Sequence, residues 1–375
     1  MKKRCSILSV CFFLAFYGFS QKNNPVITAV PSLTIAPDAR AGAMGDVGAA
    51  TQADVNSQYW NPAKYAFMEN AGGVAFSYTP WLSKLVSDIN LYYLAGFWKF
   101  DPLQSVSASL RYFSLGDIEL MDEFGYPQGS TQPNEFAFDI AYSRLLSTKF
   151  SGSVAFRYIR SDLNSGVNLS GGTEMYPGNA FAADIAGYFK TPVHMSSGDG
   201  NLAFGFNISN IGSKISYDEK ETSYFIPTNL RLGGSFEYPI DDYNKISFSA
   251  DINKLLVPTQ DTMSIAEYSD ISSISGIFRS FSDAPGGFSE ELQEVMWSVG
   301  AEYVYNKQFS VRAGYFHESQ NKGNRKYFTV GAGFKLNVFE LDAGYVIATN
   351  QSNPLDQTLR FTLAFDINGL KNLIK

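Results

Sequence analysis

The chain has 375 residues and a formal net charge of −7 at pH 7. An acidic chain without clustered cations is a poor nucleic-acid binder, because phosphate binding requires positive side chains. Both cysteines, Cys5 and Cys11, lie near the N-terminus, which excludes a disulfide framework and a thiolate metal site from the rest of the chain.

Residues 1–20 predict a cleaved secretory signal. The basic start Lys2 to Arg4 precedes a short apolar run, and the small residue Ser20 stands directly before the predicted cleavage site. The run is too short for a comfortable transmembrane helix. We therefore expect an exported protein whose mature chain begins at Gln21.

The next segment, residues 21–70, shows no alternation of apolar and polar residues. Gly42, Gly45 and Gly48 recur at a spacing of three, and prolines interrupt the pattern. The segment could be a disordered arm, or a compact segment that enters or plugs a barrel. Its aromatic residues, such as Tyr59 and Trp60, need a surface to cover, so we expect it to pack in or against the barrel.

From residue 71 to 368 the main signal is a period of two, typical of half-exposed strands. Within Glu135–Ser143, Phe136, Phe138, Ile140 and Tyr142 alternate with small or charged residues. The same reasoning predicts strands at 72–79, 88–100, 104–116, 135–146, 149–162, 180–192, 201–214, 225–238, 244–257, 294–306, 308–318, 326–337, 339–349 and 357–368. No mature segment offers about 18 consecutive apolar residues, and aromatic residues make up 15% of the chain. An all-β fold follows, a 14-stranded antiparallel transmembrane barrel in the outer membrane.

The predicted connections are alternately short and long. Short turns near 101–103, 147–148, 241–243, 306–307 and 337–338 face long loops at 117–134, 163–179, 215–224, 258–293, 319–325 and 350–356. Short periplasmic turns and long external loops are typical of outer-membrane barrels. The tail 369–375 is then periplasmic. A soluble β-sandwich also alternates, but its strands are usually shorter than these.

Charged residues fall on the polar face of the predicted strands. Because a charge facing lipid is costly, we expect these side chains to face the lumen and to pair there. The residues are Arg111, Asp139, Arg157, Asp184, Arg231, Glu237, Asp251, Glu302, Arg312, Lys335, Asp342, Arg360 and Asp366.

The loop 258–293 is the longest interruption of the pattern, and such loops are commonly functional. Residues 264–280 could form a short helix. Apolar side chains on an external loop must cover the barrel mouth, a partner or lipid. A lid and a partner contact are equally good readings, and the candidate contact residues are Ile274, Ile277, Phe278, Phe281 and Phe288.

The block from Pro37 to Ala63 resembles the start of the PorV family, outer-membrane proteins of the Bacteroidetes type IX secretion system. It reads Pro-Asp-Ala-Arg-Ala-Gly-Ala-Met-Gly-Asp-Val-Gly-Ala-Ala over 37–50, followed by Asp54, Asn56 and Tyr-Trp-Asn-Pro-Ala over 59–63. The Asn-Pro-Ala box is shared with FadL-like transporters of hydrophobic compounds. The motif residues are Gly42, Met44, Gly45, Gly48, Asn61, Pro62 and Ala63.

The resemblance implies a FadL-like barrel with an N-terminal plug that performs no chemistry. It implies cargo proteins with a C-terminal signal domain, the large translocon barrel and the sortase-containing attachment complex as partners, beside outer-membrane lipid and lipopolysaccharide. The function it implies is to accept cargo at the translocon and to carry it to the attachment complex.

Motifs for catalysis, cofactors or metals are not apparent in the sequence. The two histidines, His194 and His317, lie far apart, and the glycines of the N-terminal segment lack the spacing of a phosphate loop. We therefore predict a protein that is not an enzyme and holds no cofactor. Two other functions stay open: a FadL-like transporter of hydrophobic small molecules, and a general porin.

Overall fold

The computed structural model describes residues 24–86, 88–121, 124–163, 176–218, 222–260, 263–349, 353 and 355–367. The predicted signal, 1–20, and the predicted tail, 369–375, lie outside the described residues. Among the helices that the structure describes, none is long and apolar enough to cross a membrane.

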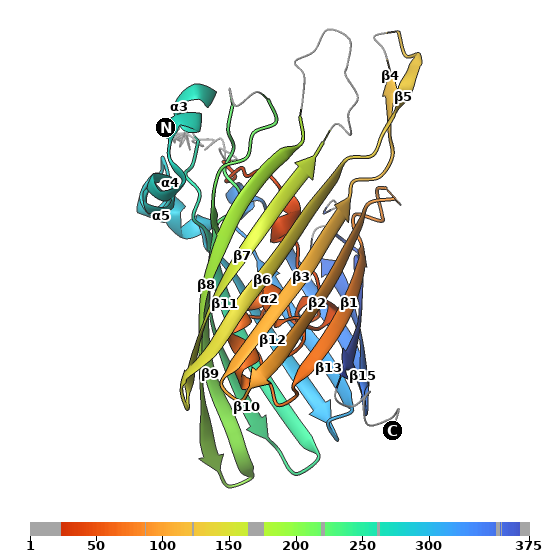
Figure 1. The fold of residues 1–375 in the computed structure, drawn as a ribbon, viewed down its shortest axis with the longest axis vertical. Coiled ribbons are helices and arrows are strands. Elements are labelled where there is room, and N and C mark those ends of the chain that lie inside the picture. Colours follow the sequence, from red (N-terminus) through yellow and green to blue (C-terminus); the bar gives the residue numbers. More distant parts are fainter. Residues whose placement is uncertain are drawn as a thin grey trace, which may run out of the picture.

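Fourteen strands of the described chain close into an antiparallel barrel (Figure 1). They are β1 Gly72–Pro80, β2 Asn90–Asp101, β3 Gln104–Ser114, β6 Asn134–Ser147, β7 Phe150–Asp162, β8 Gly178–Met195, β9 Gly198–Gly212, β10 Asn229–Pro239, β11 Asn244–Leu255, β12 Met296–Tyr305, β13 Phe309–His317, β14 Lys326–Leu336, β15 Phe339–Ala348 and β16 Leu359–Asp366. The pairing of β1 with β16 closes the ring. The predicted 14-stranded barrel is confirmed, and every predicted strand overlaps an observed one.

A small hairpin inside the predicted loop 117–134 corrects the sequence interpretation. β4 (Ile118–Met121) and β5 (Pro127–Thr131) pair with each other in a separate two-stranded sheet. Both strands are too short to show a recognisable alternation. The hairpin stands beyond the rim that carries the long loops (Figure 1).

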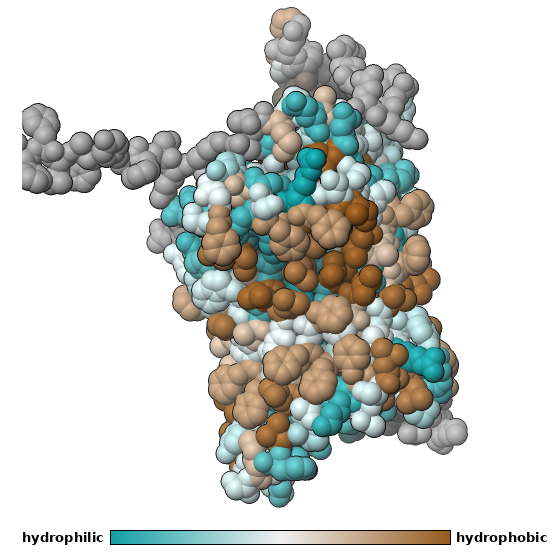
Figure 2. Space-filling view, turned by 90° about the vertical axis from the view of Figure 1, so that its left-hand side faces the viewer, coloured by the Kyte–Doolittle hydropathy of each residue, from teal (hydrophilic) through white to brown (hydrophobic). Residues whose placement is uncertain are grey.

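The outward and inward faces of the strands follow the predicted period. In β6, Phe138, Ile140 and Tyr142 are exposed, whereas Asp139 and Ala141 between them are buried. Figure 2, which views the side that carries the external helices, shows apolar and aromatic side chains gathered over the outer wall. This surface suits a hydrocarbon environment because every second side chain is apolar.

Aromatic residues mark both ends of the wall. Tyr92 and Trp297 are exposed near the rim of the long loops, and Trp98, Tyr303 and Phe309 are exposed near the rim of the short turns. Such girdles sit at the two membrane interfaces of outer-membrane barrels. Outer-membrane barrels carry their long loops outside and their short turns in the periplasm, so the rim of the long loops is the external one, and β1 begins and β16 ends on the periplasmic side.

The plug, residues 31–67, lies inside the barrel (Figure 1). Its helices are η1 Pro31–Thr34, α1 Ala39–Gly42, α2 Ser57–Trp60 and η2 Pro62–Phe67. α1 packs beside β14, β15 and β16, and η2 packs beside β6, β7 and β8, so the plug spans the lumen from wall to wall.

Short helices gather outside the lumen at the external rim (Figure 1). They are α3 Ile265–Asp270, α4 Ser273–Arg279, α5 Phe288–Glu291 and η3 Leu292–Glu294, with η4 Gln320–Lys322 in the β13–β14 loop. The helix predicted over 264–280 is present as two helices, because Ile271 is extended and Ser272 caps a new N-terminus.

Candidate functional site

The charges predicted to face the lumen are largely buried inside the barrel. The buried members are Arg111, Asp139, Arg157, Asp184, Arg231, Asp251, Glu302, Arg312, Asp342 and Arg360. The other three, Glu237, Lys335 and Asp366, line a cavity at the periplasmic end. The alternation in the sequence therefore places these residues correctly, but it does not show which of them contact the plug.

Arg40 connects the plug to the periplasmic half of the wall. Its guanidinium forms a two-pronged pair with Glu302 of β12, with Nε–Oε1 and Nη2–Oε2 distances of 3.1 and 2.8 Å. The same group bonds Asp54 of the plug at 2.8 Å, and Arg312 of β13 bonds Glu302 at 2.8 Å. Paired guanidinium–carboxylate contacts of this kind are strong and fix orientation as well as distance.

A second set of contacts holds the turn after α1. Arg360 of β16 pairs with Asp46 at 2.9 Å, and the Tyr327 hydroxyl donates to the same carboxylate at 2.6 Å. Oδ2 of Asp251 on β11 accepts hydrogen bonds from the backbone amides of Gly48 and Ala49, at 2.7 and 2.9 Å. Side chains of β11, β14 and β16, which are far apart in the sequence, thus bind one short turn of the plug.

The spaced glycines of the motif lie where the chain has no room for a side chain. Gly45 has φ +72°, and a Cβ there would be 2.7 Å from the backbone nitrogen of Tyr315. A Cβ on Gly48 would overlap the Trp60 ring, and one on Gly42 would overlap Arg360. Glycine is required at such close approaches because any side chain would push plug and wall apart.

Met44, the fourth residue of this part of the motif, is buried against two wall glycines. A Cβ on Gly300 or Gly314 would come within 2.4 or 2.1 Å of the Met44 backbone. The Met44 backbone can therefore approach the wall this closely only because Gly300 and Gly314 carry no side chain. The wall glycines carried no distinguishing sequence signal, because their partner lies more than 250 residues away in the chain.

The Asn61-Pro62-Ala63 box starts η2 and ties it to the wall. The Asn61 side chain donates to the carbonyls of Ala49 and Gly187, at 2.9 and 3.0 Å, and its Oδ1 accepts from the Ala63 amide at 3.1 Å. Pro62 at the first helical position suits this N-terminus. The box is therefore a junction between two parts of the plug and β8.

A cavity of about 570 Å³ lies on the periplasmic side of the plug. Arg40 and Asp54 of the plug contribute to its lining, together with charged residues of the lower strand ends, among them Glu237 and Lys335. A space lined by so many charges suits water. Within the described residues, no group of three His, Cys, Asp or Glu side chains is placed to hold a metal ion.

The helical loop, defined here as residues 258–295, is anchored to the barrel by a buried ion network. Lys254 of β11 pairs with Glu291 at 3.1 Å and with Glu294 at 2.5 Å. Lys322 of η4 pairs with Glu290 at 2.6 Å and with Glu294 at 3.1 Å. Because two cations share the same carboxylate, the loop is held as one unit beside the rim.

The anchored loop exposes the apolar residues that the sequence singled out. Exposed fractions are 58% for Ile274, 72% for Phe278, 50% for Phe281 and 78% for Phe288. Ile277, the fifth candidate, is half-buried. Ile274 and Phe278 are four residues apart on α4 and so share one helix face.

Two further apolar residues of the helical loop, which are not among the five candidate contact residues, are also exposed. Ile265 and Leu292 are 59% and 57% exposed. Leu292 lies four residues after Phe288, and that i, i+4 spacing was the available signal. We use the name loop face for the exposed apolar side chains of the helical loop, namely Ile265, Ile274, Phe278, Phe281, Phe288 and Leu292.

The family model described as Type IX secretion system protein PorV matches residues 19–262. The chain belongs to this family. It is therefore an outer-membrane β-barrel component of type IX secretion, and the predicted family and location are confirmed. No curated protein sequence matches the chain.

Solved structures with a similar fold are outer-membrane barrels. The Pseudomonas putida toluene transporter TodX is 11% identical, with a TM-score of 0.51 over 88% of this chain and 97% of that one. A TodX deltaS2S3 mutant monoaromatic hydrocarbon channel is 10% identical, with a TM-score of 0.52 over 88% and 98%. A Pseudomonas aeruginosa FadL homologue is 9% identical, with a TM-score of 0.45 over 92% and 99%. At such identities the likeness to TodX shows the fold alone, which is the predicted FadL-like barrel.

Proposed function

We propose that this member of the PorV family is a non-enzymatic cargo carrier of type IX secretion. It accepts secreted proteins through their C-terminal signal domain at the large translocon barrel. It then passes them to the attachment complex that contains the sortase. The observation that carries the proposal is the family match over residues 19–262, together with a barrel whose plug is fixed to its wall.

The contacts of the plug support a carrier better than a conduit. Arg40, Asp46 and Asn61 hold it to wall residues on opposite sides of the barrel. Removing either partner of a buried ion pair leaves an unpaired charge and costs several kcal/mol, on the order of 3–5. Cargo contacts are then expected on the outside of the protein, where folded domains can reach it.

The loop face is the surface that we assign to these contacts. Large apolar side chains that stay exposed on a fixed scaffold are typical of protein interaction sites. The ion network of Lys254 and Lys322 keeps the face in place without a partner, so binding would cost little ordering entropy. We propose Ile274, Phe278, Phe281 and Phe288 as its contact residues, together with the half-buried Ile277.

We propose the following division of the chain. A signal at 1–20 precedes an N-terminal segment, 21–70, of which residues 31–67 form the plug inside the barrel. The transmembrane barrel covers 71–368 and includes the helical loop, and 369–375 form a periplasmic tail. Lipid and lipopolysaccharide surround the wall.

A secretion assay with loop-face variants tests the proposal. In cells that carry only the variant, Phe278→Asp with Phe288→Asp should leave cargo in the periplasm with its C-terminal signal uncleaved. The control is Ser282→Asp, which adds one aspartate at an exposed polar site of the same loop and should leave secretion normal. Normal surface display in a strain lacking the whole protein would refute the proposal.

The alternative function is transport of hydrophobic small molecules across the outer membrane. Its support is the fold shared with barrels that are named as a toluene transporter and a hydrocarbon channel. It predicts that uptake of a labelled fatty acid or hydrocarbon fails in the deletion strain while cargo display stays normal. The opposite pair of results favours the carrier.

A further inference from the structure

The segment ahead of the plug, residues 24–30, lies at the external rim, although β1 starts at the periplasmic one. The backbone amide of Asn24 donates to the carbonyl of Asn321 in the β13–β14 loop at 3.0 Å. The Asn24 side chain donates to Glu290 of the helical loop at 3.2 Å. Between this segment and Gly72 the chain runs through the lumen, from the external rim to the periplasmic rim.

The middle of this segment forms part of the base of the helical loop. Val26 packs against a buried cluster made of Phe225, Val257, Tyr268 and Ile271. Tyr268 and Ile271 belong to the helical loop, and the Ala29 amide donates to the Phe225 carbonyl at 2.9 Å. Residues 24–30 thus lie between the helical loop and the β9–β10 connection.

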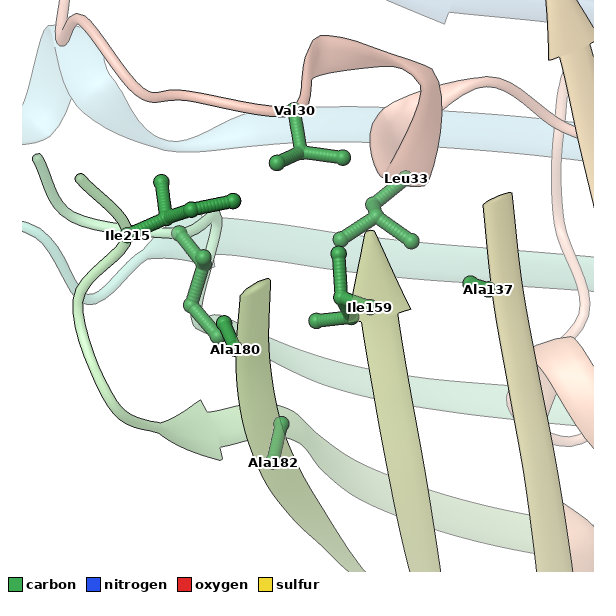
Figure 3. Close-up of a cluster of buried hydrophobic side chains, with 8 residues drawn as sticks. Val30, Leu33, Ala137, Ile159, Ala180, Ala182 and Ile215 are labelled. Carbon is green, nitrogen blue, oxygen red and sulfur yellow. The ribbon is translucent and has the colours of Figure 1, made fainter. Parts of the chain in front are cut away.

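The C-terminal end of this segment, at Val30, packs against the external end of the barrel wall. Figure 3 shows Val30 and Leu33 among Ile159, Ala180 and Ile215, in a cluster that also includes Ile226. Val30 is 1% exposed and has φ +51°, a conformation that β-branched residues rarely adopt. The chain therefore turns sharply at a buried, fixed point before it enters the plug.

We propose that residues 24–30 form an external strap, which brings the start of the mature chain to the cell surface and couples the helical loop to the plug. The predicted cleavage after Ser20 leaves three residues ahead of Asn24, and Asn24 itself is held at the external rim by Asn321 and Glu290. Because Val26 packs on the helical loop and Val30 on the wall above the plug, a displacement of either end shifts the packing of the other. The strap stands on these contacts alone and does not depend on the secretion role.

Labelling in intact cells tests the position of the strap. The chain beyond residue 20 has no cysteine, so Ile27→Cys, at a side chain that is 64% exposed, introduces a unique thiol. A maleimide on a polymer too large for porins should label it in whole cells. The control Leu103→Cys, exposed in a short turn, should react only after the outer membrane is opened. Equal protection of both thiols in whole cells would overturn the external position.

Hydrogen exchange in the purified full-length protein tests the coupling. Val26→Asp places a charge in the apolar cluster and should speed exchange of helical-loop amides at least tenfold. The matched Ile27→Asp, at the exposed neighbour, should not. In the other direction, Tyr268→Ala should speed exchange of the Ala29 amide and of the Leu33 amide of the plug, which donates to the Val30 carbonyl, because coupling between two sites is reciprocal. Unchanged exchange in both directions would overturn the coupling, and so would equal effects of the two strap variants.

Discussion

Replacing Asp251 with alanine should release the plug turn far more than replacing it with asparagine. Both the Gly48 and the Ala49 amide donate to the same oxygen, Oδ2 of Asp251. Alanine leaves two buried amides without an acceptor. Hydrogen bonds to a charged group contribute about 1.5–3 kcal/mol each, so the loss is about 4 kcal/mol. Asparagine can present its carbonyl at the same position and keep both bonds as neutral ones, about half as strong.

The assay is hydrogen exchange of the plug amides in detergent-solubilised protein. A loss of about 4 kcal/mol in local opening free energy accelerates exchange of Gly48 and Ala49 about a thousandfold. A loss of about 2 kcal/mol in the asparagine variant accelerates it about thirtyfold. Amides in the middle of the barrel strands should keep their wild-type rates. Equal acceleration in the two variants, or none in the alanine variant, would refute the reasoning that Asp251 holds the turn through these two bonds.

Three further predictions concern single positions. Gly45→Ala combines φ +72° with a Cβ only 2.7 Å from the Tyr315 backbone, and it should destabilise the protein by more than about 2 kcal/mol. The control Gly125→Ala, with φ +81° in open space, should cost only the backbone strain, about 1–2 kcal/mol. Unfolding in urea measures the free energy of unfolding of both variants. Burial and nearby carboxylates raise the pKa of Asp283 to about 6, so the folded loop takes up a proton and gains stability as pH falls from 7 towards 4. Asp283→Asn should abolish about 1 kcal/mol of that gain, measured by loop hydrogen exchange at pH 5 and 7.5. Phe288→Ser, at a side chain that is 78% exposed, should change the free energy of unfolding by less than about 0.5 kcal/mol while impairing secretion.

The strand pattern was readable from the sequence because lipid imposes it residue by residue. At Leu359, Phe361 and Leu363 an apolar side chain must face hydrocarbon, while Arg360 and Thr362 between them must face the lumen. The number of barrel strands and the direction of the charged residues follow from this local rule. Strand limits follow less closely, as at β10, which was predicted from residue 225 and begins at Asn229. The rule operates even where the strands that pair are distant in the sequence.

The plug contacts could not be derived in the same way. Arg40 and Glu302 are separated by 262 residues, and Gly45 meets Tyr315 only because the barrel closes around it. Nothing local in the sequence distinguishes Glu302 from other inward carboxylates. The resemblance at Pro37–Ala63 indicated that the segment has a conserved type of start, but the geometry alone shows what each glycine contacts.

The helical loop lies between these two cases. Its apolar residues were visible in the sequence, but the ion pairs by which Lys254 and Lys322 anchor the loop were not. The break between α3 and α4 did have a signal. Ser264 and Glu267 form a capping box, and Ser272 caps α4 eight residues later, so two helix starts stand where one helix was predicted.

Photo-crosslinking in living cells tests most directly whether the loop face meets the secretion machinery. A photoreactive amino acid at Phe278 should form adducts with the very large translocon barrel and with cargo that carries a C-terminal signal domain. The same amino acid at Ser282, in the same loop but outside the loop face, should give few or none. A protein that secretes cargo normally and shows no adduct at Phe278, Phe281 or Phe288 would contradict the account.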